Sequence, residues 1–128
     1  MNKIDKFRGC MIGLALGDAL CAPFEGGLLE SSLWRLIGKT KNKEIRFTDD
    51  TQMSNDIAKS IISYKKINQD AMALNFAQSY RWSRGYGPSA AKLLKNINKG
   101  QDWRKLNVKY FKNGSFGNDA AMRIAPIA

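Results

Sequence analysis

The sequence predicts an all-α fold of about six helices. Apolar residues recur at spacings of three and four along several stretches, which is the period of a helix with one buried face. Glycine and proline separate these stretches, and no alternating run typical of a β-strand has a convincing length. With 128 residues, of which 44% are hydrophobic and 25% charged, we expect one folded domain spanning residues 1–128.

The first predicted helix covers residues 5–20. Its apolar face carries Phe7, Met11, Leu14 and Ala15. Glycines at positions 9, 13 and 17 weaken a helix, so we interpret them as a smooth side against which a neighbouring helix packs closely. Asp18 lies near the end of this helix, and we expect it to have a polar partner because burying an unpaired carboxylate is costly.

The next segment interrupts the helical period. Pro23 and the pair Gly26-Gly27 leave Glu25 on a mobile connection, from which a carboxylate can enter and leave a site. Residues 31–38 predict a short helix, and the polar, basic residues 39–46 predict a loop.

The chain is organised around the segment from Arg46 to Thr51, in which Asp49 and Asp50 stand between two threonines. A helix of about four turns follows, because one apolar face recurs at helical spacing. This face carries Met53, Ile57, Ile61 and Tyr64. Oxygen-bearing side chains at a helix start either cap the helix or hold a hard cation such as Mg²⁺. The two interpretations are compatible, and capping alone is the commoner one.

Two more helices are predicted before residue 100. The first starts near Asn68, and its core positions are Met72, Ala73, Phe76, Ala77 and Tyr80. A turn at residues 84–87 ends it, and Pro88 suits the first turn of the next helix. The apolar residues of that helix are Ala91, Leu94 and Ile97.

Near the C-terminal end, residues 113–118 have the composition of a loop whose backbone amides can face an anion. We expect a helix to begin at Asp119, with Asn118 or Asp119 as its cap. Pro126 follows within about two turns, so we expect the end of this helix to be frayed.

The formal net charge of +10 is concentrated between Lys92 and Lys112. This stretch contains seven basic residues and one acidic residue, Asp102. Such a stretch can attract nucleic acid or another polyanion, or can be a solvated surface, which we favour. The two cysteines, Cys10 and Cys21, are too few for a disulfide framework and indicate a reducing compartment.

An N-terminal signal peptide is conceivable, because Lys3, Lys6 and Arg8 precede an apolar stretch, but Asp5 and Asp18 argue against it. We expect no stretch long enough to cross a membrane. The sequence therefore predicts a cytoplasmic protein.

Four motifs occur in register along the chain, and together they resemble the ADP-ribosylglycohydrolase family. They are Gly17-Asp18-Ala19-Leu20 with Pro23-Phe24-Glu25, Thr48-Asp49-Asp50-Thr51, Arg84-Gly85-Tyr86-Gly87, and Gly114-Ser115-Phe116-Gly117-Asn118 with Ala121-Met122-Arg123. The resemblance covers essentially the whole chain and is closest to the ADP-ribosylserine and poly(ADP-ribose) hydrolase type. It implies an all-α fold, bound Mg²⁺, and hydrolysis of the glycosidic bond between ADP-ribose and a protein side chain or related acceptor.

The resemblance also implies roles for particular residues. The implied metal ligands are Thr48, Asp49 and Asp50. Glu25 is implied to be the carboxylate on the mobile segment over the substrate ribose, and the implied catalytic carboxylate that assists proton transfer is Glu25 or Asp50. The implied loop around the phosphates and ribose consists of Gly114, Ser115, Gly117 and Asn118. Asp18 is implied to lie near the site, where we expect structural support rather than metal ligation.

Only the first part of the family domain is represented. A full domain is more than twice this length, and its later half supplies an Asp-x-Asp-Thr motif and a histidine. This sequence has no histidine and does not repeat that motif after Thr51. We therefore expect a partial helical bundle with weak or no turnover, and an oligomer or companion chain that covers its apolar faces. Asp119 replaces a glycine of the family loop, where its charge should weaken diphosphate binding.

Two alternatives from other functional classes remain. The chain could be a non-catalytic module that binds ADP-ribose or its polymer through residues 114–118. It could also bind nucleic acid through the basic stretch at residues 92–112, with an affinity that falls steeply with salt.

Overall fold

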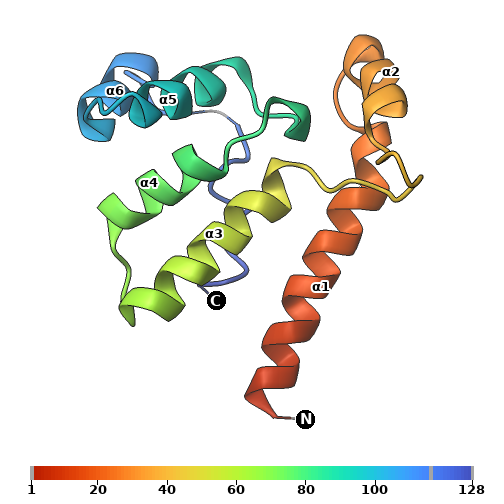
Figure 1. Ribbon diagram of the computed structural model, residues 1–128, viewed down its shortest axis with the longest axis horizontal. Coiled ribbons are helices and arrows are strands. Elements are labelled where there is room, and N and C mark those ends of the chain that lie inside the picture. The colour runs from red at the N-terminus through yellow and green to blue at the C-terminus, as the bar shows by residue number, and fades with distance from the viewer. Residues whose placement is uncertain (1, 116, 128) are drawn as a thin grey trace.

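The computed structural model describes residues 2–115 and 117–127, and within them it is built from helices (Figure 1). The α-helices are α1 (Lys3–Cys21), α2 (Leu28–Ile37), α3 (Asp49–Tyr64), α4 (Gln69–Ser79), α5 (Pro88–Asn98) and α6 (Trp103–Tyr110), and the 3₁₀ turns are η1 (Ala22–Phe24) and η2 (Trp82–Arg84). The extended pairing among these residues is one isolated antiparallel bridge between Lys39 and Ile45. The all-α prediction is confirmed.

Helices α3 to α6 follow one another as packed neighbours, with α4 against both α3 and α5 and α6 against α5 (Figure 1). The core between α4, α5 and α6 consists of Ala77, Leu94, Ile97 and Leu106. The first three are core positions that the helical period predicts. Phe76 and Tyr80 of α4 pack against this cluster, which confirms this part of the predicted apolar stripe, whereas Met72 and Ala73 are half-buried and line a cavity.

Helix α3 is held at both ends by local capping. The Thr48 hydroxyl accepts a hydrogen bond from the Asp50 amide (3.3 Å), and Lys65 ends the helix in a left-handed conformation (φ 55°). Of its predicted apolar face, Met53 and Ile57 are buried, whereas the prediction is wrong for Tyr64, which is 50% exposed. The face of α3 that packs against α4 is partly polar.

The polar contacts between α3 and α4 meet at Ser79. Its hydroxyl donates to the Asp56 carboxylate, and its carbonyl accepts from the Gln52 side chain. Burial raises the pKa of Asp56, while the bond from Ser79 acts in the opposite direction. These bonds fix the rotation of α3 against α4, and therefore the direction in which the start of α3 points.

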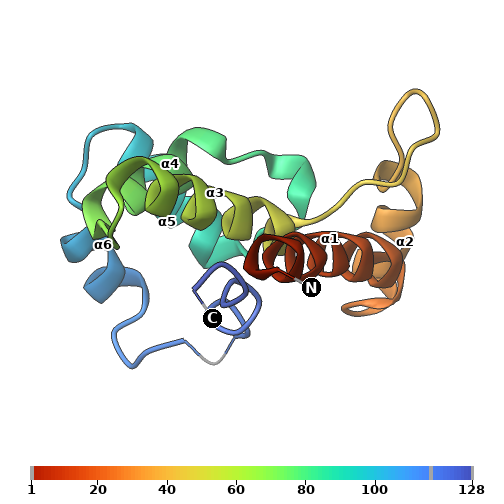
Figure 2. The same ribbon diagram turned by 90° about the horizontal axis from the view of Figure 1, so that it is seen from below.

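The C-terminal segment differs from the prediction. The helix expected from Asp119 is absent from residues 117–127, which form successive turns. Within it, Met122 N–H donates to the Asn118 carbonyl (3.0 Å), but the following bonds span three residues, as in the bond from Ile124 to Ala121. Pro126 explains the failure: it lacks an N–H, and too few residues precede it to offset the cost of nucleating a helix. The segment runs beside α3 (Figure 2), where the Ser54 hydroxyl donates to the Met122 carbonyl (3.2 Å).

Helix α1 stands beside α3 and carries α2 near its C-terminal end (Figure 1). It starts two residues earlier than predicted, because the Asn2 side chain accepts hydrogen bonds from the amides of Ile4 (2.6 Å) and Asp5 (3.2 Å). Helix α2 likewise starts earlier than predicted, at Leu28.

No residue of α1 is buried. A Cβ atom built on Gly9, Gly13 or Gly17 would meet nothing within 4 Å, so the described residues include no helix against this side. Residues Lys3–Phe24 are also long and apolar enough to cross a membrane, with a mean hydropathy of 1.3 in an 18-residue window. The expectation that no stretch has this length is therefore wrong.

We expect two leucines to differ clearly in their contribution to the free energy of unfolding, because one lies in the core and the other is exposed. Leu94 is 3% exposed and Leu36 is 82% exposed. We expect Leu94→Ala to lower the free energy of unfolding by about 2–5 kcal/mol through lost burial and a new cavity, whereas Leu36→Ala should change it by less than about 0.5 kcal/mol. Urea unfolding followed by circular dichroism measures both, and equal losses would contradict this assignment of the core.

Candidate functional site

The site begins with the carboxylate of Asp18, which ties α1 to the first turn of α3. Its two oxygens accept hydrogen bonds from the Thr48 amide (3.0 and 2.9 Å). One of them also accepts from the Thr51 amide (3.1 Å) and the Thr51 hydroxyl (2.5 Å). These amides belong to the helix start, where backbone donors lack partners within the helix. Asp18 therefore has the polar partner that the sequence analysis expects.

The amide capping by Asp18 and Thr48 fixes Asp49 and Asp50 side by side. Burial, followed by repulsion from Asp50, raises the pKa of Asp49 to about 7. Burial, followed by the charges of Asp18 and Glu25, raises the pKa of Asp50 to about 6. The start of α3 thus concentrates carboxylates in a partly desolvated place, and Glu25, which follows η1, lies close enough to add to their repulsion.

The turn after α4 supports this helix start from the other side. The Arg84 guanidinium donates to the Phe47 carbonyl (2.5 Å) and lies over the Phe47 ring, 3.7 Å from its centre. Gly85 has a φ of +85°, and a Cβ there would approach the Asp49 Oδ1 atom at 3.7 Å. The glycine is needed for the left-handed turn, which brings the backbone close to Asp49.

A cavity of about 390 Å³ opens beside Asp49, whereas Asp18 and Asp50 are not among the residues that line it. Its lining includes Glu25, Thr48 and Asp49 on its polar side, and Trp34 and Tyr86 among its aromatic residues. The hydroxyl of Tyr86 is buried without a hydrogen-bond partner among the described residues, and burial raises the pKa of Tyr86. This cavity therefore joins acids from two segments of the chain with an aromatic wall.

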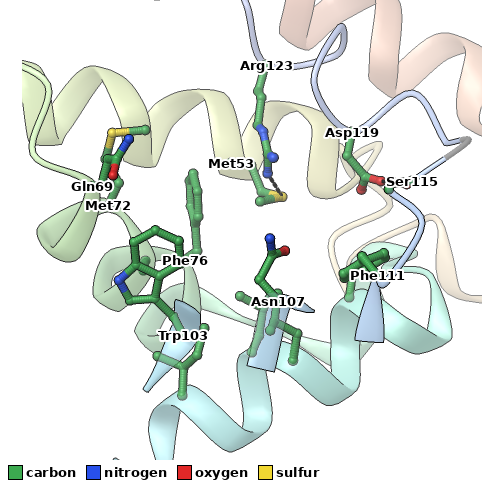
Figure 3. A pocket seen from close by; sticks show the side chains of 16 residues that line it. Met53, Gln69, Met72, Phe76, Trp103, Asn107, Phe111, Ser115, Asp119 and Arg123 are labelled. Carbon is green, nitrogen blue, oxygen red and sulfur yellow. Dashed lines mark hydrogen bonds between the residues drawn. The ribbon is translucent and has the colours of Figure 1, made fainter. Parts of the chain in front are cut away.

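A second cavity, of about 430 Å³, lies between α3, α4, α5, α6 and the C-terminal loop (Figure 3). Gly114 and Ser115 line it, together with Asp119 and Arg123 and with apolar side chains of the helices. Gly114 takes a φ of +80°, which explains why the loop has a glycine there.

Asp119 folds back onto its own loop. Its Oδ2 atom accepts a hydrogen bond from the Ser115 hydroxyl (3.3 Å), and that hydroxyl accepts one from the Gly117 amide (3.2 Å). The carboxylate therefore engages the Ser115 donor that an anionic ligand would use. Gly117 and Asn118 are exposed and are not among the residues that line the cavity.

Five of the sequence-predicted site residues divide between the two cavities, and the other three, Asp50, Gly117 and Asn118, line neither of them. Glu25, Thr48 and Asp49 line one of them, and Gly114 and Ser115 line the other. The link between the two is electrostatic: Asp119 lies close enough to Asp49 to contribute to the raised pKa of Asp49. The acids and the glycine loop are neighbours, but they do not face one common hollow.

The donor set suits part of a Mg²⁺ shell. Within residues 2–115 and 117–127, no three His, Cys, Asp or Glu side chains come together as a metal cluster. Asp49 and Asp50 nevertheless supply two carboxyl groups, and burial together with nearby carboxylates raises the pKa of each. Mg²⁺ commonly binds one or two carboxylates and keeps several waters. The residues present therefore fit such an ion, with other ligands coming from water, substrate or further polypeptide.

Sequence reasoning missed Arg123. It gave this residue a place in a motif but no role, and the structure puts its side chain into the second cavity (Figure 3). The available signal was a single cation in an otherwise apolar C-terminal segment. Tyr86 lies in the predicted turn at residues 84–87, and the absence of a hydrogen-bond partner for its hydroxyl among the described residues could not be read from the sequence.

The chain belongs to the ADP-ribosylglycohydrolase family, whose model matches residues 1–128. It is 32% identical to the chicken protein named ADP-ribosylhydrolase ARH3 over 95% of this chain and 39% of that protein. An uncharacterized protein of Archaeoglobus fulgidus is 34% identical over 96% of this chain and 42% of its own length. The human ADP-ribosylhydrolase ARH3 is 28% identical over 99% of this chain and 40% of its own length. The chain therefore spans about two fifths of the curated relatives it matches.

The raised pKa of Asp49 predicts a pH dependence. A carboxyl with a pKa near 7 in the folded state and near its ordinary value when unfolded destabilises the fold as the pH rises from about 4 to about 7. In EDTA, we expect the melting temperature to be lower at pH 8 than at pH 5. Asp49→Asn should raise it at pH 8 and reduce the difference between the two pH values.

Asp70→Asn is the matched control. A hydrogen bond from Arg104 lowers the pKa of Asp70, so this group does not titrate between pH 5 and pH 8. The control should keep the wild-type difference between the two pH values, measured by differential scanning fluorimetry. If Asp49→Asn also keeps this difference in melting temperature, Asp49 is not the carboxyl group that destabilises the fold as the pH rises.

Proposed function

We propose that this chain carries the metal-binding and phosphate-binding part of a hydrolase that cleaves the glycosidic bond between ADP-ribose and a protein side chain or related acceptor. The observation that carries the proposal is the Asp18-anchored start of α3, which carries Asp49 and Asp50 and brings Asp49 within electrostatic range of Asp119, a residue hydrogen-bonded to Ser115 of the loop. Family membership supports the reaction class. Residues 1–128 would then form part of one domain of that kind.

Asp49, Asp50 and Thr48 would hold Mg²⁺. When bound, the ion supplies Lewis-acid polarisation of the ribose hydroxyls and of a water. Asp18 keeps the helix start in register, so that the carboxylates of α3 remain directed toward the ligand. Asp50 and Glu25 are the groups that would accept a proton from the attacking water, because the charge of Glu25 helps to raise the pKa of Asp50.

The loop would bind the phosphates and ribose through Gly114, Ser115, Gly117 and Asn118. Backbone amides in such a glycine-rich loop stabilise anions without adding bulk. The Gly117 amide currently donates to Ser115, so ligand binding would exchange this internal bond for a bond to phosphate. Asp119 opposes that exchange, because its carboxylate is already bonded to the same serine.

The direct test is release of ADP-ribose from ADP-ribosylated serine and arginine peptides, with Mg²⁺ and with EDTA. Because the chain spans about two fifths of the relatives' length, we expect Mg²⁺-dependent ADP-ribose binding but turnover at least about 100-fold below that of the full-length chicken relative, as expected when part of a catalytic unit is absent. Asp50→Asn should abolish the Mg²⁺ dependence of binding, and Asp102→Asn, at the start of α6, should not.

Two outcomes would change this proposal. If the chain binds neither Mg²⁺ nor ADP-ribose, the hydrolase assignment is wrong for these residues. Turnover equal to that of the relative would support the hydrolase and would contradict the expectation that residues 1–128 lack part of the site.

We propose further that the exposed face of α1 is covered by further polypeptide of the same family fold. No residue of α1 is buried, and Ile12 and Leu16 are 66% and 58% exposed. A single soluble domain rarely leaves so continuous an apolar surface open. The relatives contain more than half of their length beyond the matched region, which is the chain length available to cover it.

This face predicts how the isolated chain behaves. We expect it to self-associate at concentrations of tens of micromolar, a typical range for exposed apolar surfaces, as measured by size-exclusion chromatography with light scattering. The double variant Ile12→Glu, Leu16→Glu should remain monomeric and keep the wild-type melting temperature, since neither side chain is buried. A wild-type chain that stays monomeric and melts cooperatively under the same conditions would contradict the proposal.

A further inference from the structure

Arg123 is a partly buried cation that has no carboxylate within 4.0 Å among the described residues. The ion pair that these residues do form joins Arg104 to Asp70 at 2.7 Å and lies at the surface. The Arg123 guanidinium instead donates to the Met53 thioether at 3.6 Å and lies 5.3 Å from the centre of the Phe76 ring. Figure 3 shows it directed into the cavity between the helices and the C-terminal loop.

This environment leaves most of the hydrogen-bonding capacity of the guanidinium unused. A guanidinium has five N–H donors, and a thioether sulfur is a weak acceptor. Burial lowers the pKa of Arg123, and the charges of Asp119 and Asp49 offset this only in part. A desolvated cation without a close anion is unfavourable unless a ligand completes its coordination.

The backbone that carries Arg123 is held firmly. Met122 is buried, its carbonyl accepts from Ser54 (3.2 Å), and its amide donates to the Asn118 carbonyl (3.0 Å). Ser54 directly follows Met53 on α3. The guanidinium is therefore positioned from the same helix that carries Asp49 and Asp50.

The rest of the cavity indicates which kind of ligand it suits. Aromatic side chains from α4, α6 and the residue after α6 line it, and the glycine loop forms one edge (Figure 3). These aromatic residues are Phe76, Trp103 and Phe111. Aromatic faces suit a planar base, while a guanidinium and backbone amides suit phosphate oxygens. The volume of about 430 Å³ is in the range of small-molecule sites.

We propose that Arg123 is a diphosphate-binding residue, which pairs with the phosphate oxygens of a nucleoside-diphosphate ligand in this cavity. The proposal deepens the function proposed above and rests on it, because ADP-ribose is such a ligand. Arg123 and Asp119 then act in opposite directions. Arg123 attracts the diphosphate, and Asp119 competes with it for Ser115 and repels it.

Isothermal titration calorimetry with two probes tests this assignment. ADP-ribose carries the diphosphate, and adenosine lacks it. We expect Arg123→Gln to weaken ADP-ribose binding about 10- to 100-fold, as expected for the loss of charged hydrogen bonds, and to leave adenosine binding unchanged. Arg123→Lys should retain part of the affinity, and Asp119→Asn should strengthen ADP-ribose binding several-fold, as removal of a like charge predicts.

Arg8→Gln is the matched control, because Arg8 is exposed on α1, lines neither cavity and should not affect ADP-ribose binding. Melting temperatures of all variants show whether each one is folded. Asp119→Asn leaves Arg123 intact, so it tests the proposal even if Arg123→Gln does not fold.

The outcomes distinguish a failure of the Arg123 assignment from a failure of the proposed function. If the wild type binds ADP-ribose and Arg123→Gln binds it equally well, the role of Arg123 is wrong and the proposed function stands. Equal losses for ADP-ribose and adenosine would also overturn it, since they would show a packing role. An unchanged affinity in Asp119→Asn would contradict the opposition between the two charges. If the wild type does not bind ADP-ribose, the proposed function fails as well.

Discussion

The site depends on the hydrogen bonds that the Asp18 carboxylate accepts from Thr48 and Thr51. They join two helices that otherwise share little burial, and they satisfy amides at the start of α3 that have no partner within the helix. The same bonds occupy both Asp18 oxygens. Asp18 is therefore a positioning residue in this arrangement, while Asp49 and Asp50 remain the carboxylates that are free to interact with a cation.

Unpaired charges of both signs are built into the region around α3. Desolvation raises the pKa values of Asp49 and Asp50, with added repulsion from nearby carboxylates, and desolvation lowers the pKa of Arg123. Each of these states is unfavourable in the protein alone. A cation beside the acids and an anion beside the guanidinium would stabilise these charged groups at the same time. A phosphate-containing substrate that binds together with a metal ion would bring both.

The sequence predicts the helices well because their apolar period is local information. Ala77, Leu94 and Ile97 are core residues for this reason. The failure at residues 119–127 is also physical, since a cap and a few apolar residues do not nucleate a helix ahead of Pro126. The exposure of α1 could not be read from its composition. An apolar helix has the same sequence pattern whether or not the described residues include a helix that packs against it.

The candidate site is less accessible to sequence reasoning, because its interactions join distant positions. The order of the motifs identifies the acids and the glycine loop, but it does not show that they line separate cavities. The partner of Asp18 lies 30 residues away, and Arg123 contacts Met53 across 70 residues. The unpaired state of that guanidinium follows only from the packing around it.

Paramagnetic relaxation by Mn²⁺, substituted for Mg²⁺ in a ¹H–¹⁵N NMR spectrum, tests most directly whether the start of α3 is a cation site beside the loop. The account predicts selective broadening of the amides of Thr48 to Thr51 and Gly85, with weaker broadening at Asp119. Broadening confined to other acids, or none at a Mn²⁺ concentration comparable to that of the protein, would contradict it.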